Sequence, residues 1–114
     1  MTPPKMLARG GTRVPCDISI TLTSLDSLHP FFESCHIVLV NQQGCAAKLR
    51  RSVMAGVAVR LQGLPVMGKV TARVINCICL GKHEKLWFLG LALDQPGNVW
   101  GIEMPPDDWI QESV

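Results

Sequence analysis

The sequence predicts an all-β fold, either an antiparallel barrel or a sandwich. About six strand-like segments follow one another at short spacing, and turns rich in glycine, proline and asparagine separate them. No segment with helical periodicity lies between them. Short strands without helical crossovers are typical of antiparallel barrels and sandwiches rather than of parallel sheets.

The first residues are expected to differ from the rest. Residues 1–12 contain Pro3-Pro4, which disfavours a helix, and Gly10-Gly11, which leaves the backbone free to turn, so we expect a flexible arm. Residues 13–114 form the predicted β domain. Its first strand shows five regular alternations of apolar and polar residues, with the apolar positions at Val14, Cys16, Ile18, Ile20 and Leu22.

Five further strands and one helix complete the expected elements. The strands cover residues 35–40, 45–49, 57–62, 69–80 and 86–93. The last strand is apolar on both faces, so we expect it to be the most buried. A short C-terminal helix is expected over 107–114, because Pro106 suits a first helical position and Asp107-Asp108 complement the helix dipole. Trp100 and Trp109 are expected to fasten the C-terminal segment across one end of the domain.

Composition and charge narrow the class of protein. The chain has 114 residues, of which 47% are hydrophobic and 18% charged, so it forms one core and is not intrinsically disordered. Eleven basic and nine acidic side chains give a net charge of +2, which suits a small anion better than DNA or RNA. The longest apolar run, Leu86–Leu93, is too short for a membrane helix, and the first residues lack a signal-peptide pattern. We expect a cytoplasmic domain without membrane insertion.

The sequence contains no pattern for catalysis or for a metal site. The histidines His29, His36 and His83 lie in no nucleophile or metal motif, and no glycine-rich phosphate loop precedes a helix. The five cysteines form no zinc-type double pair, and Cys77 and Cys79 are expected as buried free thiols in a reducing compartment. We therefore expect no enzymatic activity, no metal and no cofactor.

Two arginines of the arm suit an anionic ligand. Arg9 and Arg13 lie on either side of Gly10-Gly11, directly before the first strand. Guanidinium groups make paired hydrogen bonds to phosphate and to the O6/N7 edge of guanine. Solvated arginines also occur on loose termini, so the segments that follow decide how this pair is interpreted.

The order of these segments resembles the PilZ domain family, small bacterial receptors for cyclic di-GMP. The first motif of that family, Arg-x-x-x-Arg before a strand, matches Arg9 to Arg13 followed by Val14-Pro15. Later segments are similar to successive segments of the family: Gly56–Val59, Gly68–Val74, Leu89–Leu93 and Val99–Trp109. The resemblance spans residues 9–109 in the right order.

The second PilZ motif, Asp/Asn-x-Ser-x-x-Gly, is altered in this chain. The corresponding segment begins at Asn41, which the motif allows. Without a gap, Gln43 replaces the serine and Ala46 replaces the glycine. With two residues deleted, Gly44 is the family glycine. In either alignment the chain resembles a divergent member with a degenerate second motif.

The resemblance implies a six-stranded antiparallel β-barrel with a terminal helix and cyclic di-GMP bound on its outside. The implied ligand-binding residues are Arg9, Arg13, Asn41, Gln43 and Gly44. The arginines would contact phosphates and a guanine, Asn41 would bond the base, and the glycine would admit the ligand close to the backbone.

The implied function is that of a non-catalytic receptor or adaptor in bacterial second-messenger signalling, which passes the signal to an unidentified effector protein. Two alternatives stay open. One is a degenerate PilZ-type adaptor that binds a protein and no nucleotide. The other is an OB-like barrel that binds single-stranded nucleic acid, against which the small net charge argues.

Overall fold

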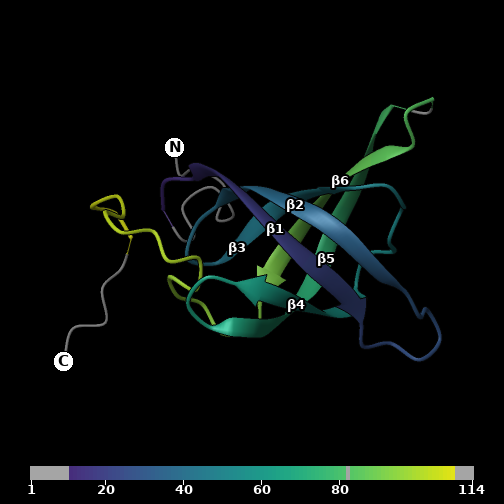
Figure 1. Cartoon of the computed structure of the whole chain (residues 1–114), viewed down its shortest axis with the longest axis horizontal. Helices are drawn as coiled ribbons and strands as arrows, with labels where there is room; N and C mark the ends of the chain where they lie inside the picture. Colours follow the sequence, from purple (N-terminus) through teal and green to yellow (C-terminus); the bar gives the residue numbers. More distant parts are fainter. Residues whose placement is uncertain (1–10, 82, 110–114) are drawn as a thin grey trace, which may run out of the picture.

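The predicted strands close into a six-stranded antiparallel β-barrel (Figure 1). The computed structural model describes residues 11–81 and 83–109. The strands are β1 (Val14–Ser24), β2 (Phe32–Val40), β3 (Gly44–Leu49), β4 (Ala58–Leu64), β5 (Gly68–Gly81) and β6 (Leu86–Leu93). They neighbour each other in the order β1-β2-β3-β6-β5-β4, and β1 also pairs with β4, which closes the barrel. Of the two architectures that the sequence allowed, the barrel is correct.

The alternation of side chains between the two faces of each strand fills the barrel interior. Along β1, Ile20 and Leu22 point inward and are buried, whereas Ser19, directly before Ile20, points outward and is exposed. Inward positions of the other strands complete one core, which includes Ile37, Val59, Leu61, Val74, Leu89 and Leu91. Burial of one such side chain contributes about 1.5–3 kcal/mol to stability. The period-2 pattern in the sequence therefore sets which residues face the core.

β6 is the most enclosed strand of the described barrel, as predicted. It lies between β3 and β5, and none of its residues is exposed, whereas every other described strand has at least one exposed residue. Leu86–Leu93 has apolar residues on both faces, which suits a strand that is paired on both edges by β3 and β5.

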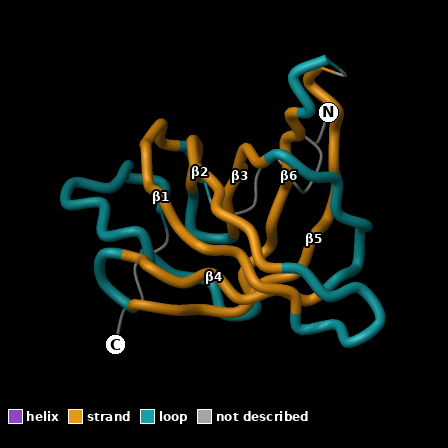
Figure 2. Tube along the Cα trace, turned by 45° about the vertical axis from the view of Figure 1, so that its right-hand side comes forward, coloured by secondary structure: helices purple, strands orange, loops and turns teal. Residues whose placement is uncertain are grey.

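The end of the β5–β6 hairpin projects from the barrel (Figure 2). β4 pairs with β5 only as far as Arg73, and a loop bonds the backbone of Val74. Beyond that point β6 is the only described strand that pairs with β5, so the other edge of residues 75–81 has no strand partner, and the N–H of Val53 donates to the sulfur of Cys77 there at 3.5 Å. The edge carries no charged side chain, and Ile75 and Ile78 are 59% and 52% exposed. Sheet edges are usually protected by charge, proline or a covering segment.

The segment after β6 crosses one end of the barrel without a helix in its described part. Residues 107–109 form a turn, in which the N–H of Trp109 donates to the carbonyl of Pro106 at 3.1 Å. The helix predicted for 107–114 is therefore not found in 107–109, and 110–114 lie outside the described residues. The carboxylate of Asp108, which we expected to complement a helix dipole, accepts hydrogen bonds from Thr12 instead.

Trp100 and Trp109 fasten this segment to the barrel, as predicted. Each is 1% exposed. The indole N–H of Trp100 donates to the carbonyl of Asn41 at 2.7 Å, and that of Trp109 donates to the carbonyl of Thr12 at 2.6 Å. A buried indole contributes a large apolar area and here also has its single donor satisfied. Among the described residues, no helix is long and apolar enough to cross a membrane.

Replacement of Asp108 by alanine is expected to lower the thermal unfolding midpoint at pH 7. The carboxylate accepts the N–H and the hydroxyl of Thr12, at 3.0 and 2.7 Å, and these bonds lower the pKa of Asp108 from its ordinary value of 3.8. A carboxyl whose pKa is depressed by folding stabilises the protein above its unfolded-state pKa. That contribution is lost as the pH falls through the lower folded-state pKa.

The difference between wild type and Asp108→Ala should therefore be complete at neutral pH and should shrink as the pH falls below 3.8, the ordinary pKa of this carboxyl. Asp107→Ala is the control, because Asp107 is also exposed but makes no hydrogen bond in the described chain. Thermal melts followed by circular dichroism measure both. Equal effects of the two variants, or a difference that does not depend on pH, would contradict this assignment.

Candidate ligand-binding site

The pairing of β1 with β2 brings Arg13 and Asn41 to the same end of the barrel. Val14 pairs with Val40, so Arg13, one residue before this pair, and Asn41, one residue after it, flank the same point. Arg13 is exposed and Asn41 is half-buried. The other predicted arginine, Arg9, lies outside the described residues. Of the predicted set, the described chain therefore brings together Arg13 and the 41–44 turn.

The turn from Asn41 to Gly44 closes the β2–β3 hairpin. The Oδ1 atom of Asn41 accepts the backbone N–H groups of Gln43 and Gly44 at 2.9 and 3.1 Å. The N–H of Asn41 donates to the carbonyl of Gly44 at 3.0 Å. An asparagine that bonds the backbone two and three residues ahead is a turn-forming residue. Asn41 therefore has a structural role, whatever it contacts in a ligand.

The C-terminal segment fixes this turn from outside. The N–H of Leu93 donates to the carbonyl of Gln43, and the N–H of Gly97 donates to the carbonyl of Gln42, both at 2.8 Å. The Trp100 indole bonds the carbonyl of Asn41, as described above. The backbone carbonyls of three successive turn residues are thus satisfied, so the turn offers a rigid surface rather than an adaptable one.

Gly44 is required by the packing of β3 against β6. It is buried, and a Cβ atom at this position would overlap the carbonyl oxygen of Leu91. This contact gives the glycine a role inside the barrel, and its predicted role toward a ligand stays a prediction. Ala46, the gapless equivalent of the family glycine, lies in β3 without a positive φ, so its methyl group causes no backbone strain there.

The chain just before Arg13 is held by the C-terminal segment. Gly11 has a φ of +79°, and a Cβ atom there would lie 2.7 Å from Asp108, so glycine suits both the conformation and the space. Thr12 bonds Asp108 and Trp109 through its N–H, hydroxyl and carbonyl. Arg13 therefore lies between Thr12, which is fastened to the C-terminal segment, and the first residue of β1.

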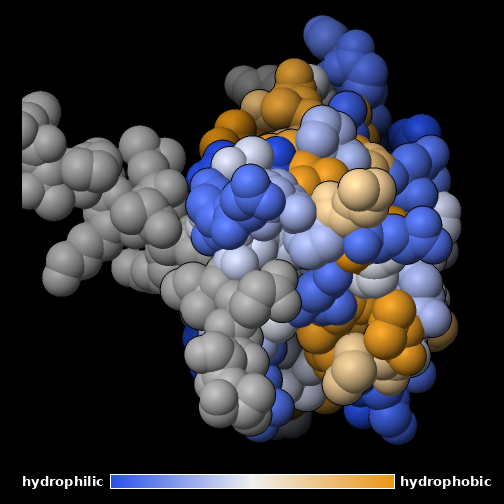
Figure 3. All heavy atoms as spheres, turned by 90° about the vertical axis from the view of Figure 1, so that its left-hand side faces the viewer, coloured by the Kyte–Doolittle hydropathy of each residue, from blue (hydrophilic) through white to orange (hydrophobic). Residues whose placement is uncertain are grey.

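A groove of about 740 Å³ lies beside the 41–44 turn, between the outer face of β4–β5 and the loop of residues 94–99. The bond from Gly97 to Gln42 connects this loop with the turn. Arg60 and Lys69 line the groove, and so does Asp94. Figure 3 views the end of the barrel that carries the turn, where hydrophilic side chains cover much of the described surface.

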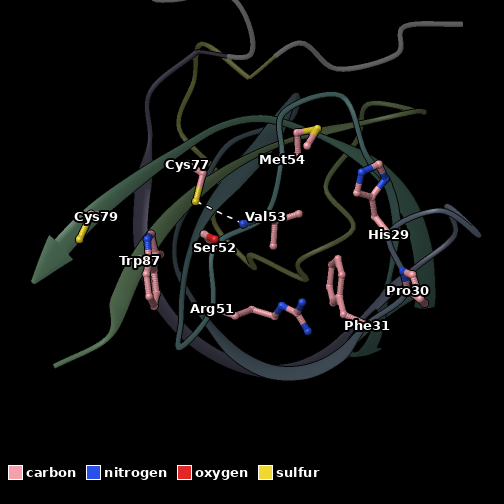
Figure 4. A pocket seen from close by; sticks show the side chains of 10 residues that line it. All are labelled: His29, Pro30, Phe31, Arg51, Ser52, Val53, Met54, Cys77, Cys79 and Trp87. Carbon is pink, nitrogen blue, oxygen red and sulfur yellow. Dashed lines mark hydrogen bonds between the residues drawn. The ribbon is translucent and has the colours of Figure 1, made fainter. Parts of the chain in front are cut away.

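A second cavity, of about 690 Å³, lies at the opposite end of the barrel (Figure 4). Trp87 and two cysteines line one side of it, and His29 to Phe31 line the other. The guanidinium of Arg51 lies 4.8 Å from the centroid of the Phe31 ring. Arg51 is therefore remote from the predicted site. Sequence reasoning missed this cavity, since its lining comes from two loops and the β5–β6 hairpin, which share no motif.

The thiols and other candidate metal ligands form no reactive centre in the described chain. All five cysteines are free, and no group of three or more His, Cys, Asp or Glu side chains is placed to hold a metal ion within residues 11–81 and 83–109. Burial raises the pKa of Cys35 to about 12, so this thiol stays protonated at neutral pH. Cys79 is exposed and Cys77 half-buried, so the expectation of buried thiols is wrong for Cys79. Its strand has left the barrel at that point.

Comparison of the chain with family models, curated proteins and solved structures gave no match. The PilZ resemblance therefore rests on the segments that carry it in the sequence.

Gly44→Ala is expected to destabilise the barrel by about 1–3 kcal/mol or more, since the added methyl group overlaps a backbone carbonyl that β6 cannot readily move. Urea unfolding followed by tryptophan fluorescence measures the change. Gly81→Ala is the matched control: it also lies in a strand, but the nearest atom is the flexible end of the Glu84 side chain. Equal stability of the two variants would refute the packing role of Gly44.

Proposed function

We propose that this chain is a non-catalytic receptor domain that binds cyclic di-GMP at the barrel end formed by Arg13 and the 41–44 turn. The observation that carries the proposal is the β1–β2 register, in which Val14 opposite Val40 brings Arg13 next to Asn41. The closed antiparallel barrel of six strands agrees with the architecture that the resemblance implies.

The chemistry of the ligand matches the residues at this end. Cyclic di-GMP carries two phosphate charges and two guanine bases, and an exposed guanidinium can contact either group. Arg13 supplies one guanidinium on a backbone fastened at Thr12, and Arg9 supplies a second in the proposal. The net charge of the chain, +2, favours the approach of a small dianion.

The fixed turn and the arm have different parts in this proposal. The 41–44 turn is held by hydrogen bonds on both sides, so binding costs little conformational entropy there. Closure of the arm residues over the ligand would convert binding into a change of shape that an effector protein reads in the cytoplasm. The effector is a separate protein in this proposal.

A second candidate function, an adaptor that binds a protein without nucleotide, is favoured by the edge of β5 that has no strand partner. On the edge of residues 75–81 that faces away from β6, no strand pairs with the backbone donors and acceptors. These residues also carry no charge that would repel an added strand. An extended segment of a partner can pair with such an edge. This function predicts no nucleotide binding, so one titration separates the two candidates.

Isothermal titration calorimetry of the purified domain with cyclic di-GMP tests the proposal. We expect saturable binding, and about 10- to 100-fold weaker binding for Arg13→Ala, because a charge-assisted contact is worth about 1.5–3 kcal/mol. Arg9→Ala is expected to weaken binding similarly, and Asn41→Ala to weaken it through loss of the turn.

Arg51→Ala is the matched control, since it removes the same charge at the opposite end of the barrel. It should leave the affinity for cyclic di-GMP unchanged. Absence of binding by the wild-type domain, or equal losses from Arg13→Ala and Arg51→Ala, would overturn the proposed site. Absence of binding would favour the adaptor function instead.

A further inference from the structure

We propose that the groove between β4–β5 and residues 94–99 is a binding site for a small oxyanion, with Arg60 as its principal ligand and Lys69 as a second cation. The site differs from the one proposed for cyclic di-GMP, since it shares none of the predicted ligand residues and lies on other strands. It rests on the geometry of the groove and on an unsatisfied guanidinium.

The strand register brings the two cations to the same side of the sheet. Arg60 pairs with Thr71, and Gln62, two residues further along β4, pairs with Lys69. Paired residues and residues two apart share a face. Leu61, which lies between Arg60 and Gln62, is fully buried and so points inward. The face that Arg60 and Gln62 share is therefore the outside of the barrel. Arg60 and Lys69 therefore lie diagonally across neighbouring strands and both line the groove of about 740 Å³.

Arg60 has an unmet requirement for acceptors. Its Nε atom is buried and has no hydrogen-bond partner. Its guanidinium makes no hydrogen bond or ion pair among the described residues. The ion pairs found there join a histidine to an aspartate and do not include Arg60. A guanidinium has five N–H donors and no acceptor role, so only an acceptor can satisfy it. Buried polar atoms are nearly always hydrogen-bonded, and the Nε atom is covered by protein atoms. The terminal amino groups of this groove-lining side chain would therefore be the ones that donate to an oxyanion.

The remaining charge in the groove does not supply that acceptor. Asp94 lines the groove, yet it forms no ion pair within 4.0 Å with either cation. The backbone N–H of Asp94 donates to the carbonyl of Thr71 at 3.1 Å, which holds the start of the loop beside the strand pair. Two cations against one carboxylate leave an excess of one positive charge. A phosphate-like oxyanion balances that excess and accepts several hydrogen bonds.

The test is a heteronuclear NMR titration of the full chain with inorganic phosphate at constant ionic strength, with acetate in a parallel series. We expect saturable shifts at the Arg60 side-chain Nε–Hε signal and at the backbone amides of residues 69–71 and 94–98. A stronger response to phosphate assigns the site to phosphate-bearing ligands, and a stronger response to acetate assigns it to carboxylates. Shifts that grow without saturation in both series would overturn the proposal.

Variants give the site two opposite expectations. Arg60→Met keeps the apolar stem and should weaken the binding of the better anion at least about tenfold, the loss expected for one charge-assisted contact. Asp94→Asn should strengthen it, because the repelling charge is removed. Arg73→Ala is the control: its exposed guanidinium on β5 bonds the carbonyl of Gly56 and does not line the groove. Equal anion affinity in Arg60→Met and wild type would refute the site. Arg13→Ala should leave the anion affinity of the groove unchanged, whether or not the domain binds cyclic di-GMP.

Discussion

The pairing of β1 with both β2 and β4 is the constraint on which the other features of this molecule depend. Through β4 it closes the barrel, and through β2 it fixes which residues meet at the open ends. A shift of one residue would turn Ile20 and Leu22 away from the core, so burial specifies the register strongly. The same register sets Arg13 beside Asn41. The hydrophobic core thus determines the position of residues that have no part in it.

The C-terminal segment converts this barrel end into a defined surface. Trp100 bonds the β2–β3 turn, and Trp109 with Asp108 bonds the chain ahead of β1. The β2–β3 turn and the chain before β1 are therefore both hydrogen-bonded to the C-terminal segment. A ligand bound at this end would contact residues whose spacing is already fixed, which lowers the entropic cost of binding. The groove that Arg60 lines is also next to the C-terminal segment, because the loop of residues 94–99 forms one of its walls.

Much of the fold was predictable because period-2 patterns report directly on burial. Leu86–Leu93 was predicted with its observed bounds, and the roles of Trp100 and Trp109 followed from large apolar residues in a closing segment. The turn at 107–109 was missed, since the partner of Asp108 is Thr12, about a hundred residues away. For the candidate site, the resemblance to the PilZ motifs could nominate Arg13 and Asn41. It could not show that Asn41 holds the turn or that Arg60 lacks an acceptor, because both depend on tertiary contacts.

The central claim is that the ligand binds where the β1–β2 register joins Arg13 to the 41–44 turn. Backbone amide shifts of the ¹⁵N-labelled domain on addition of cyclic di-GMP test it most directly, because they locate the contact without any substitution. The account predicts shifts concentrated in residues 11–15 and 40–46, with residues 29–31 and 51–54 at the other barrel end unaffected. Shifts centred on that other end, or none at saturating ligand, would contradict it.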